Sequence, residues 1–307
     1  MTTTSAFPAL DGVLFFPVTP FTAGDRVDIP ALKQHVDERV AAGPGGVFIG
    51  CGTGEFHALS AGEYADVVRA GVEATAGRVP VLAGVGGPLG HARECVAAAV
   101  SAGVDGLLVM PPYLVRGPQD GVASYIEAIA ASTDLPIIAY HRGSAQLTLP
   151  TVERLLDLPT LMGIKDGVGD VALAQQFVRA ARTHGRSDVQ FFNGLLTAEA
   201  SQSAYRAIGI PLYSSAVFAM APEIALAFYS AYEAGDEVRQ DQFLDEFFTP
   251  LVRLRDTTPG FAVSLIKAGV RLGGLEVGGV RPPLTSPTHA QVEVLAELLS
   301  TGRRIAA

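Results

Sequence analysis

Short apolar runs alternate with stretches of helical spacing along the first two thirds of the chain. The runs are rich in Val, Ile and Leu, and they lie at residues 13–18, 46–50, 79–85, 105–110, 135–140, 160–165, 189–193 and 210–215. Between them, apolar residues recur every three or four positions, as at Leu32, Val36 and Val40. Continuous apolar runs are typical of strands that are covered on both faces, as in a parallel sheet.

Eight strand–helix units are the number that closes a (β/α)8 TIM barrel, an α/β fold. An open, doubly wound sheet is the alternative, and periodicity alone does not exclude it. The regular succession of eight strand–helix units favours the barrel. In a TIM barrel the active site lies at the C-terminal ends of the strands. Helix signals support the units: Ser60 with Glu63 forms a capping-box pattern, and Asp170 is placed to cap a helix over 171–183 that Gly185 ends.

No short apolar run typical of a strand follows Ser215. In the remaining sequence, apolar residues recur at the spacing of helices. We expect helices at 222–234, 237–255, 261–272 and 289–300, with a loop rich in Pro and Gly at 278–287. The pattern therefore predicts two regions. Residues 1–220 form the barrel, and residues 221–307 form a C-terminal helical extension packed on it.

Composition excludes several classes of protein. An apolar content of 49% argues against general disorder, and a formal charge of −9 argues against nucleic acid or a membrane surface as the partner. No run approaches the roughly 18 apolar residues that a membrane span needs. The N-terminal segment 1–10 has neither the basic region nor the apolar core of an export signal, so we expect a cytoplasmic protein.

The sequence shows no recognisable metal or nucleotide site. Cys51 and Cys95 are the only cysteines, and we expect both to be reduced thiols. The histidines form no closely spaced pair, so a structural zinc site is not expected. The glycines of 84–90 resemble a dinucleotide fingerprint, but Pro88 interrupts the turn and the last glycine is displaced by one position. We therefore expect no cofactor.

Only three lysines are present, and one of them has an unusual position. Lys33 lies on an amphipathic stretch, and the stem of Lys267 could run along the surface of a helix. Lys165 instead ends an apolar strand and precedes a glycine-containing turn. In a barrel its amine would face the active site, where desolvation lowers the pKa and favours attack on a carbonyl. The alternative is an ion pair with Asp166.

Other polar residues also end predicted strands. Tyr140 could transfer protons or hold a carboxylate, and Arg142 could bind a carboxylate with two hydrogen bonds. Each could equally be an ordinary rim or surface residue. Ser214 and Ser215 end the eighth strand, where their hydroxyls could reach those of a sugar acid.

A glycine-rich loop at 50–56 follows the second strand. Its glycines would let backbone amides approach an anion closely, and Thr53 adds a hydroxyl. The loop is not a phosphate-binding P-loop, because no Gly-Lys-Ser/Thr follows it.

Together these motifs resemble the dihydrodipicolinate synthase/N-acetylneuraminate lyase family of Schiff-base barrels over essentially the whole chain. The matching segments, in the family's order, are Pro17-Val18-Thr19-Pro20-Phe21, Gly52-Thr53-Gly54-Glu55, Pro112-Tyr113, Tyr140 and Ile164-Lys165-Asp166. The resemblance implies that Lys165 forms the Schiff base with Tyr140 and Thr53 as catalytic partners. It also implies that the 52–54 loop binds substrate, that Tyr113 contacts the site of a neighbouring subunit, and that the protein is a homo-oligomer, either a dimer or a tetramer.

Departures from the family pattern indicate one branch. Gly52 and Ala145 stand where synthases usually carry a second hydroxyl residue and a carboxylate-binding arginine. The segments 165–170, 193–199 and 213–218 instead resemble decarboxylating dehydratases, although Ala219 stands where that branch has an asparagine.

This branch resemblance implies a keto sugar acid as the small-molecule partner. The chain would convert 5-dehydro-4-deoxyglucarate to 2,5-dioxopentanoate, water and CO2, with Arg142, Asn193, Ser214 and Ser215 holding the substrate. An aldolase that cleaves a 2-keto-3-deoxy sugar acid to pyruvate, and a keto-acid-sensing barrel without catalysis, are the alternatives.

Overall fold

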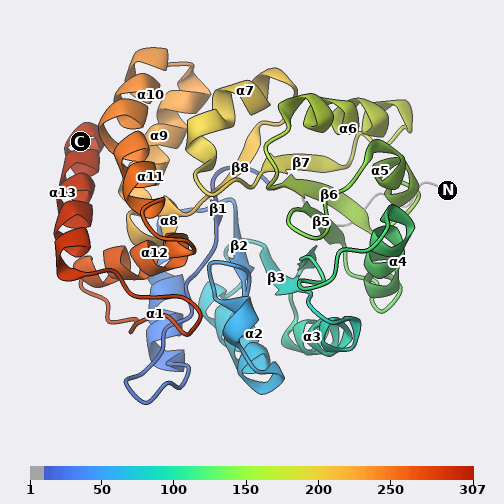
Figure 1. Cartoon of the computed structure of the whole chain (residues 1–307), viewed down its shortest axis with the longest axis horizontal. Helices are drawn as coiled ribbons and strands as arrows, with labels where there is room; N and C mark the ends of the chain where they lie inside the picture. Colours follow the sequence, from blue (N-terminus) through green and yellow to red (C-terminus); the bar gives the residue numbers. More distant parts are fainter. Residues whose placement is uncertain (1–9) are drawn as a thin grey trace.

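The computed structural model describes residues 10–307, and it shows a closed barrel of eight parallel strands with helices outside (Figure 1). The strands are β1 (Leu14–Phe15), β2 (Gly46–Ile49), β3 (Val81–Val85), β4 (Gly106–Val109), β5 (Ile137–His141), β6 (Leu161–Asp166), β7 (Gln190–Asn193) and β8 (Leu212–Ser215). Because β1 pairs with both β2 and β8, the sheet has no free edge. The prediction of a barrel is therefore confirmed, and the open-sheet alternative is wrong.

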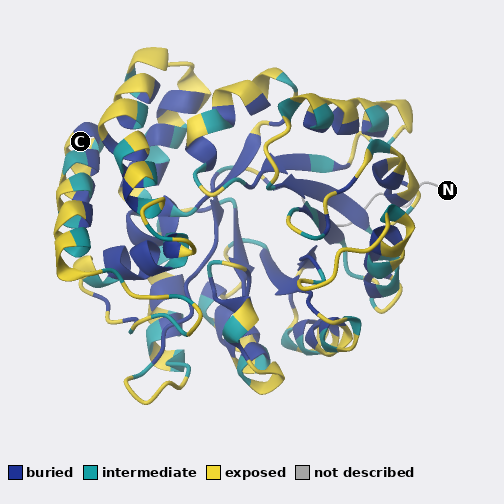
Figure 2. Cartoon of the chain, in the orientation of Figure 1, coloured by how far each residue is buried: buried dark blue, intermediate teal, exposed yellow. Residues whose placement is uncertain are grey.

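Seven helices follow the first seven strands in turn, and they cover the outside of the barrel. They are α1 (Ile29–Val40), α2 (Ala61–Thr75), α3 (Leu89–Ala102), α4 (Gln119–Ala130), α5 (Leu149–Leu155), α6 (Val171–Thr183) and α7 (Gln202–Ala207). Figure 2 shows buried strands inside a ring of helices whose outer faces are exposed. Two short 3-10 helices, η1 (Phe56–Ala58) and η2 (Ala198–Ser201), lie in the loops before α2 and α7.

The predicted helix signals are confirmed. Ser60 and Glu63 form both hydrogen bonds of a capping box at the start of α2. The Asp170 carboxylate accepts a hydrogen bond from the Leu173 amide, and Gly185 follows α6 with a φ of +74°. Such local signals depend only on residues close in the chain, which is why the sequence suffices to find them.

The C-terminal helices gather on one side of the barrel (Figure 1). They are α8 (Val217–Met220), α9 (Pro222–Ala234), α10 (Glu237–Phe243), the π-helix η3 (Leu244–Phe248), α11 (Thr249–Arg255), α12 (Phe261–Leu272) and α13 (His289–Ala306). The C-terminal helical extension is thus confirmed. The boundary between regions 1–220 and 221–307 stays a prediction, since α9 packs on β8 through contacts of Tyr213 with Phe228 and Tyr232.

Some predicted bounds differ from the structure for identifiable reasons. The first strand spans two residues rather than six, because Pro17 has no N–H to offer and the Val18 amide donates to the His35 ring. The helix predicted over 237–255 contains the π-helix η3 just before Pro250, another residue without an N–H. The last helix continues to Ala306, beyond the predicted Ser300.

Two observations concern the export and membrane predictions. Within residues 10–307, no helix combines the length and the apolar character that a membrane crossing requires. The prediction that segment 1–10 is not an export signal concerns residues 1–9, which lie outside the described part of the chain.

Candidate active site

A cavity of about 1030 Å³ opens at the C-terminal ends of the barrel strands. Tyr140 of β5, Lys165 of β6 and Ser214 of β8 line its floor, and the 52–53 turn after β2 forms part of its wall. Residues 258–263, at the start of α12, also line the cavity. The strand ends are therefore brought together as the sequence predicted, and the C-terminal extension completes the wall.

Lys165 is buried among aromatic rings beneath this cavity. Its side chain is 4% exposed, and the amine lies 3.8 Å from the centroid of the Phe16 ring and 4.6 Å from that of Tyr140. Burial lowers its pKa to about 7, and the nearby Arg142 cation adds to this effect. A large fraction of the amine is therefore uncharged at neutral pH, which is the form that attacks a carbonyl.

The alternative ion pair between Lys165 and Asp166 is absent. Successive residues of a strand point to opposite faces, so Asp166 lies outside the barrel when Lys165 points inward. Its carboxylate accepts hydrogen bonds from the Tyr205 hydroxyl and, at 2.8 Å, from the Val168 amide. Asp166 therefore fixes the turn after β6 and leaves the Lys165 amine without an acidic partner in the described residues.

The lowered pKa of Lys165 predicts a specific pH dependence. Short pulses of pyruvate, each quenched with borohydride at one fixed pH, should give adduct rates that rise with pH and level off above about 7. Below that value the amine is protonated and cannot attack. Folding stability should also rise with pH between about 7 and the usual 10.5, because the unfolded chain keeps this proton longer. A rate that is flat from pH 6 to 8.5 would contradict the assignment.

Tyr140 and Arg142 form a polar pair beside Lys165. The Tyr140 hydroxyl accepts a 2.8 Å hydrogen bond from Arg142 Nη1 and donates to the Gly194 carbonyl at 3.2 Å. Burial raises the pKa of Tyr140, whereas Arg142 opposes that rise. Tyr140 is thus a protonated phenol at neutral pH. Within the described chain Arg142 has no acidic partner, so its guanidinium can receive an anion.

Two glycines make room for these side chains. A Cβ at position 194 would lie 2.2 Å from Lys165 Cε and 2.6 Å from its Cγ. A Cβ at position 167 would lie 2.8 Å from Tyr140 Cε2 and 3.2 Å from Arg142 Cδ. The sequence motifs around these glycines do not indicate this role, because the glycines approach the Lys165, Tyr140 and Arg142 side chains only in the folded barrel.

Several of the predicted site residues face the cavity. Gly52, Thr53, Arg142 and Ser214 line it together with Lys165 and Tyr140. Tyr113 also lines it, from an exposed loop after β4, with a φ of +59° in the left-handed region that side chains other than glycine rarely adopt. These positions agree with a shared site.

Three predicted substrate-binding residues do not line the cavity. Asn193 donates to the Ala198 carbonyl and holds the loop after β7, and Ser215 donates to the buried Glu199 carboxylate at 2.5 Å. Both follow an inward-pointing residue in their strands and therefore face outward. Gly54 is buried behind the turn, where its carbonyl accepts from the Thr19 hydroxyl at 2.7 Å. Their positions indicate support of the loops rather than contact with substrate.

The expectation for Lys267 is wrong. Instead of running along the surface of a helix, it is fully buried in α12 and pairs with Glu55 at 2.7 Å. The partner lies 212 residues away in sequence, so no local pattern could have indicated it. Sequence reasoning also missed Phe16, which packs against the Lys165 amine, and the cavity-lining start of α12.

The described residues offer no evident metal centre. In the 10–307 range, no three His, Cys, Asp or Glu side chains are grouped so that they could hold an ion. Cys51 lines the cavity, but burial raises the pKa of its thiol to about 12. The thiol therefore stays protonated, which leaves Lys165 as the better nucleophile.

Comparison with known proteins agrees with this geometry. A protein from Streptomyces griseus named "Probable 5-dehydro-4-deoxyglucarate dehydratase" is 52% identical over 96% of this chain and 93% of its own length. One of the same name from Pseudomonas fluorescens is 39% identical over 94% of each chain. The name of these relatives is that of a dehydratase, the branch indicated by the positions at which this sequence departs from the synthase pattern.

Solved structures and the family profile give the same result. A dihydrodipicolinate synthase from Bacillus clausii superposes with a TM-score of 0.87 at 26% identity, covering 96% of this chain and 98% of its own. A prophage protein of the dihydrodipicolinic acid synthase family from E. coli K12, solved with pyruvate, superposes with a TM-score of 0.84 at 26% identity over 95% and 98% of the two chains. The profile of the dihydrodipicolinate synthetase family matches residues 9–301. The chain belongs to the dihydrodipicolinate synthetase family.

Proposed function

We propose that the protein is a decarboxylating dehydratase, which converts 5-dehydro-4-deoxyglucarate to 2,5-dioxopentanoate through a Schiff base on Lys165. The main support is the Lys165 amine, which is buried at the cavity floor, has no acidic partner in the described chain and has a pKa lowered to about 7. The names of the relatives from Streptomyces griseus and Pseudomonas fluorescens support the choice of substrate.

The carbons are numbered here from the carboxylate next to the ketone, so that the ketone is C2. The proposed reaction begins with condensation of the Lys165 amine and this C2 ketone, which releases one water. The resulting cationic imine acidifies the neighbouring CH2, and loss of a C3 proton gives an enamine. The enamine expels the C4 hydroxyl as a second water. The imine is then conjugated with a new C3–C4 double bond.

Decarboxylation uses the same electron sink. The C5–C6 bond breaks, its electron pair moves through the double bond toward the imine nitrogen, and C6 leaves as CO2. The resulting dienamine carries an enol at C4–C5. Protonation at C4 converts this enol to the C5 aldehyde, and protonation at C3 restores the imine, whose hydrolysis releases the product and frees the amine. The hydrolysis consumes one water, so each substrate yields one aldehyde, one water and one CO2. This route requires no metal or organic cofactor, because the imine accepts the electrons of both steps.

Tyr140 and Thr53 are the proposed catalytic partners of Lys165, Tyr140 in proton transfer and Thr53 in holding the substrate. Tyr140 packs its ring 4.6 Å from the Lys165 amine and is protonated at neutral pH, so it can give a proton to the carbinolamine oxygen or to the leaving hydroxyl. Thr53 lines the cavity from the turn after β2, where its hydroxyl and the adjoining amides can hold the carboxylate next to the ketone.

Arg142 and Ser214 are the proposed contacts for the far end of the substrate. Both line the cavity, and within residues 10–307 Arg142 contacts no carboxylate. An arginine in this position can hold the carboxylate that is lost, so that the breaking bond lies perpendicular to the conjugated plane. Ser214 is the better candidate of the serine pair, because Ser215 faces away from the cavity.

Product stoichiometry tests the proposed reaction. Incubation with 5-dehydro-4-deoxyglucarate should release one CO2 and one 2,5-dioxopentanoate per substrate, with no pyruvate, as measured by mass spectrometry and CO2 capture. Pyruvate with no CO2 would make the protein an aldolase. Failure to form a borohydride-stable adduct with any 2-keto acid would indicate a sensing barrel instead.

Replacing Tyr140 with phenylalanine should lower kcat by roughly 10²-fold, the scale expected for loss of a proton-transfer group. The ring would still pack beside Lys165, so imine trapping with borohydride should persist. Steady-state kinetics and the adduct yield, compared in the same preparation, separate the two effects. Unchanged kcat would reduce Tyr140 to a packing role.

The proposed assembly and location follow from the family resemblance. Tyr113 lines the cavity but lies in an exposed loop beside the fully exposed Leu114 and the exposed Val115. An apolar loop at the cavity rim suits burial against a second copy, as in a homo-oligomer. We also propose a cytoplasmic location for this enzyme.

A further inference from the structure

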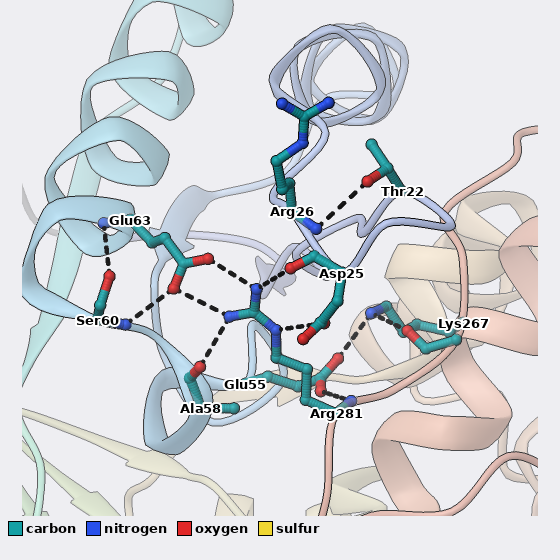
Figure 3. A network of polar contacts seen from close by, with 10 residues as sticks. Thr22, Asp25, Arg26, Glu55, Ala58, Ser60, Glu63, Lys267 and Arg281 are labelled. Atoms are coloured by element: carbon teal, nitrogen blue, oxygen red, sulfur yellow. Dashed lines mark hydrogen bonds and ion pairs between the residues drawn. The ribbon is translucent and has the colours of Figure 1, made fainter.

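A buried ion pair lies directly behind the cavity wall and joins distant parts of the chain. The Lys267 amine of α12 contacts the Glu55 carboxylate at 2.7 Å, and both side chains have no exposed surface (Figure 3). Because the pair is sealed from solvent, neither group can contact the substrate directly. Any influence on the reaction must therefore pass through the elements that the pair connects.

Both oxygens of Glu55 and the amine of Lys267 form hydrogen bonds within the protein. The second Glu55 oxygen accepts from the Arg281 amide at 2.8 Å, and the Lys267 amine also donates to the Gly279 carbonyl at 2.6 Å. The same amine lies 4.1 Å from the centroid of the Phe21 ring. The Glu55–Lys267 pair is therefore a fixed connection between two parts of the chain and not an empty binding site. We call this pair the junction.

On one side, the junction holds the turn that forms the cavity wall. Glu55 ends the 52–54 turn with a φ of +55°, and its amide donates to the Gly52 carbonyl at 3.1 Å. Gly52 and Thr53 line the cavity on the opposite side of the same turn. A shift of the Glu55 side chain would therefore move the Thr53 hydroxyl and the adjoining amides.

On the other side, the junction holds α12. Lys267 directly follows Ile266, which lines the cavity, and Phe261 and Val263 line it one turn earlier. The pair consequently sets the position of two parts of the cavity wall, the 52–54 turn and α12, relative to each other.

Stability alone does not account for an ion pair in this place. Removing two charges from water costs as much as their attraction returns, and apolar pairs of similar volume often stabilise a core equally well. A charged pair does, however, impose direction and distance on the groups that it joins. A fixed direction and distance are what is needed to hold the 52–54 turn in place against α12.

We propose that Glu55 and Lys267 are positioning residues, which fix the Gly52–Thr53 turn against α12 so that Thr53 and the turn amides meet the substrate carboxylate next to the imine. The inference rests on the proposed Schiff-base function. In this proposal the Gly52–Thr53 turn is correctly placed only when the Glu55–Lys267 pair is intact, although the substrate does not contact the pair. A misplacement of about 1 Å can cost roughly 10²-fold in rate.

The decisive variant is the double substitution Glu55→Gln with Lys267→Met. It removes both charges, so no unpaired charge remains buried, and the melting temperature should fall only modestly, because the Gly279 carbonyl loses its hydrogen bond from Lys267. We expect kcat/KM for 5-dehydro-4-deoxyglucarate to fall roughly 10²-fold. At saturating pyruvate, borohydride should still label Lys165 completely, but the half-saturating pyruvate concentration should rise.

A matched control separates positioning from stability. Leu299→Ala removes a fully buried side chain of α13, a helix none of whose residues lines the cavity, so it should lower the melting temperature without changing kcat or KM below that temperature. A double variant with wild-type kcat/KM and wild-type pyruvate affinity would overturn the proposal. Equal kinetic losses in Leu299→Ala would also overturn it. Failure of the wild type to form any adduct would instead overturn the proposed function.

Discussion

Replacing Lys165 with arginine is expected to lower kcat by roughly 10⁴-fold or more, the scale seen when a covalent nucleophile is removed. The guanidinium stays positively charged at all working pH values and cannot form an imine, so both dehydration and decarboxylation lose their electron sink. Steady-state assays should detect no product above background. Borohydride with pyruvate should leave no adduct on the tryptic peptide that contains position 165.

The fold should survive this substitution with a lowered melting temperature, because arginine places a permanent charge in a buried pocket where desolvation already lowers the pKa of Lys165. Circular dichroism and the melting temperature check that point. Lys33→Arg is the matched control: Lys33 is exposed and pairs with Glu73 on the outer surface, so both activity and adduct should match those of the wild type. Labelling of Lys33 or Lys267 in the wild type would contradict the assignment of Lys165.

The order of strands and helices could be predicted from sequence because each element carries its own local signal. All eight apolar runs became strands of the barrel, and the end of the sixth run placed Lys165 at the active-site face. Tyr140 and Lys165 are register partners in adjacent strands, so their proximity follows from two strand ends alone. This is the part of the site that secondary structure determines.

Two of the predicted substrate contacts face away from the cavity because side chains alternate between the two faces of a strand. Ser214 faces the cavity, whereas Ser215 faces Glu199 on the outside. Likewise Phe192 packs near Lys165, and the next residue, Asn193, turns outward. A side-chain period of two would have divided each pair correctly once the inward position of Lys165 was assumed, because these strands lie in one register.

Tertiary contacts account for what the sequence could not reveal. The spacing of α12 predicted a helix, but its hydrophobic pattern does not show that residues 261–263 reach the cavity. Nor does it show that Lys267 meets a glutamate from the loop after β2. The C-terminal extension is therefore part of the site. This explains why a chain with the same eight strands but a different extension could differ in specificity.

Replacing Gly194 with alanine is expected to have the second largest effect. The new Cβ would lie 2.2 Å from Lys165 Cε and 2.9 Å from the Asp166 carbonyl oxygen, far inside contact distance. The lysine side chain is the more flexible neighbour, so it should rotate away from the imine position. The Gly194 carbonyl, which accepts from the Tyr140 hydroxyl at 3.2 Å, should shift as well. Disturbing both groups should lower kcat/KM by roughly 10²-fold or more.

A glycine in open space provides the control for backbone effects. Gly62 lies in α2, and no neighbouring atom lies within 4 Å of the place that a Cβ would occupy there, so Gly62→Ala should keep full activity and slightly raise the melting temperature. For Gly194→Ala, the adduct yield at saturating pyruvate should fall together with kcat/KM, because the nucleophile itself is displaced. That joint loss distinguishes it from the Glu55→Gln, Lys267→Met double variant, in which labelling persists. Wild-type labelling and kinetics in Gly194→Ala would show that Lys165 reaches its reactive position by another path.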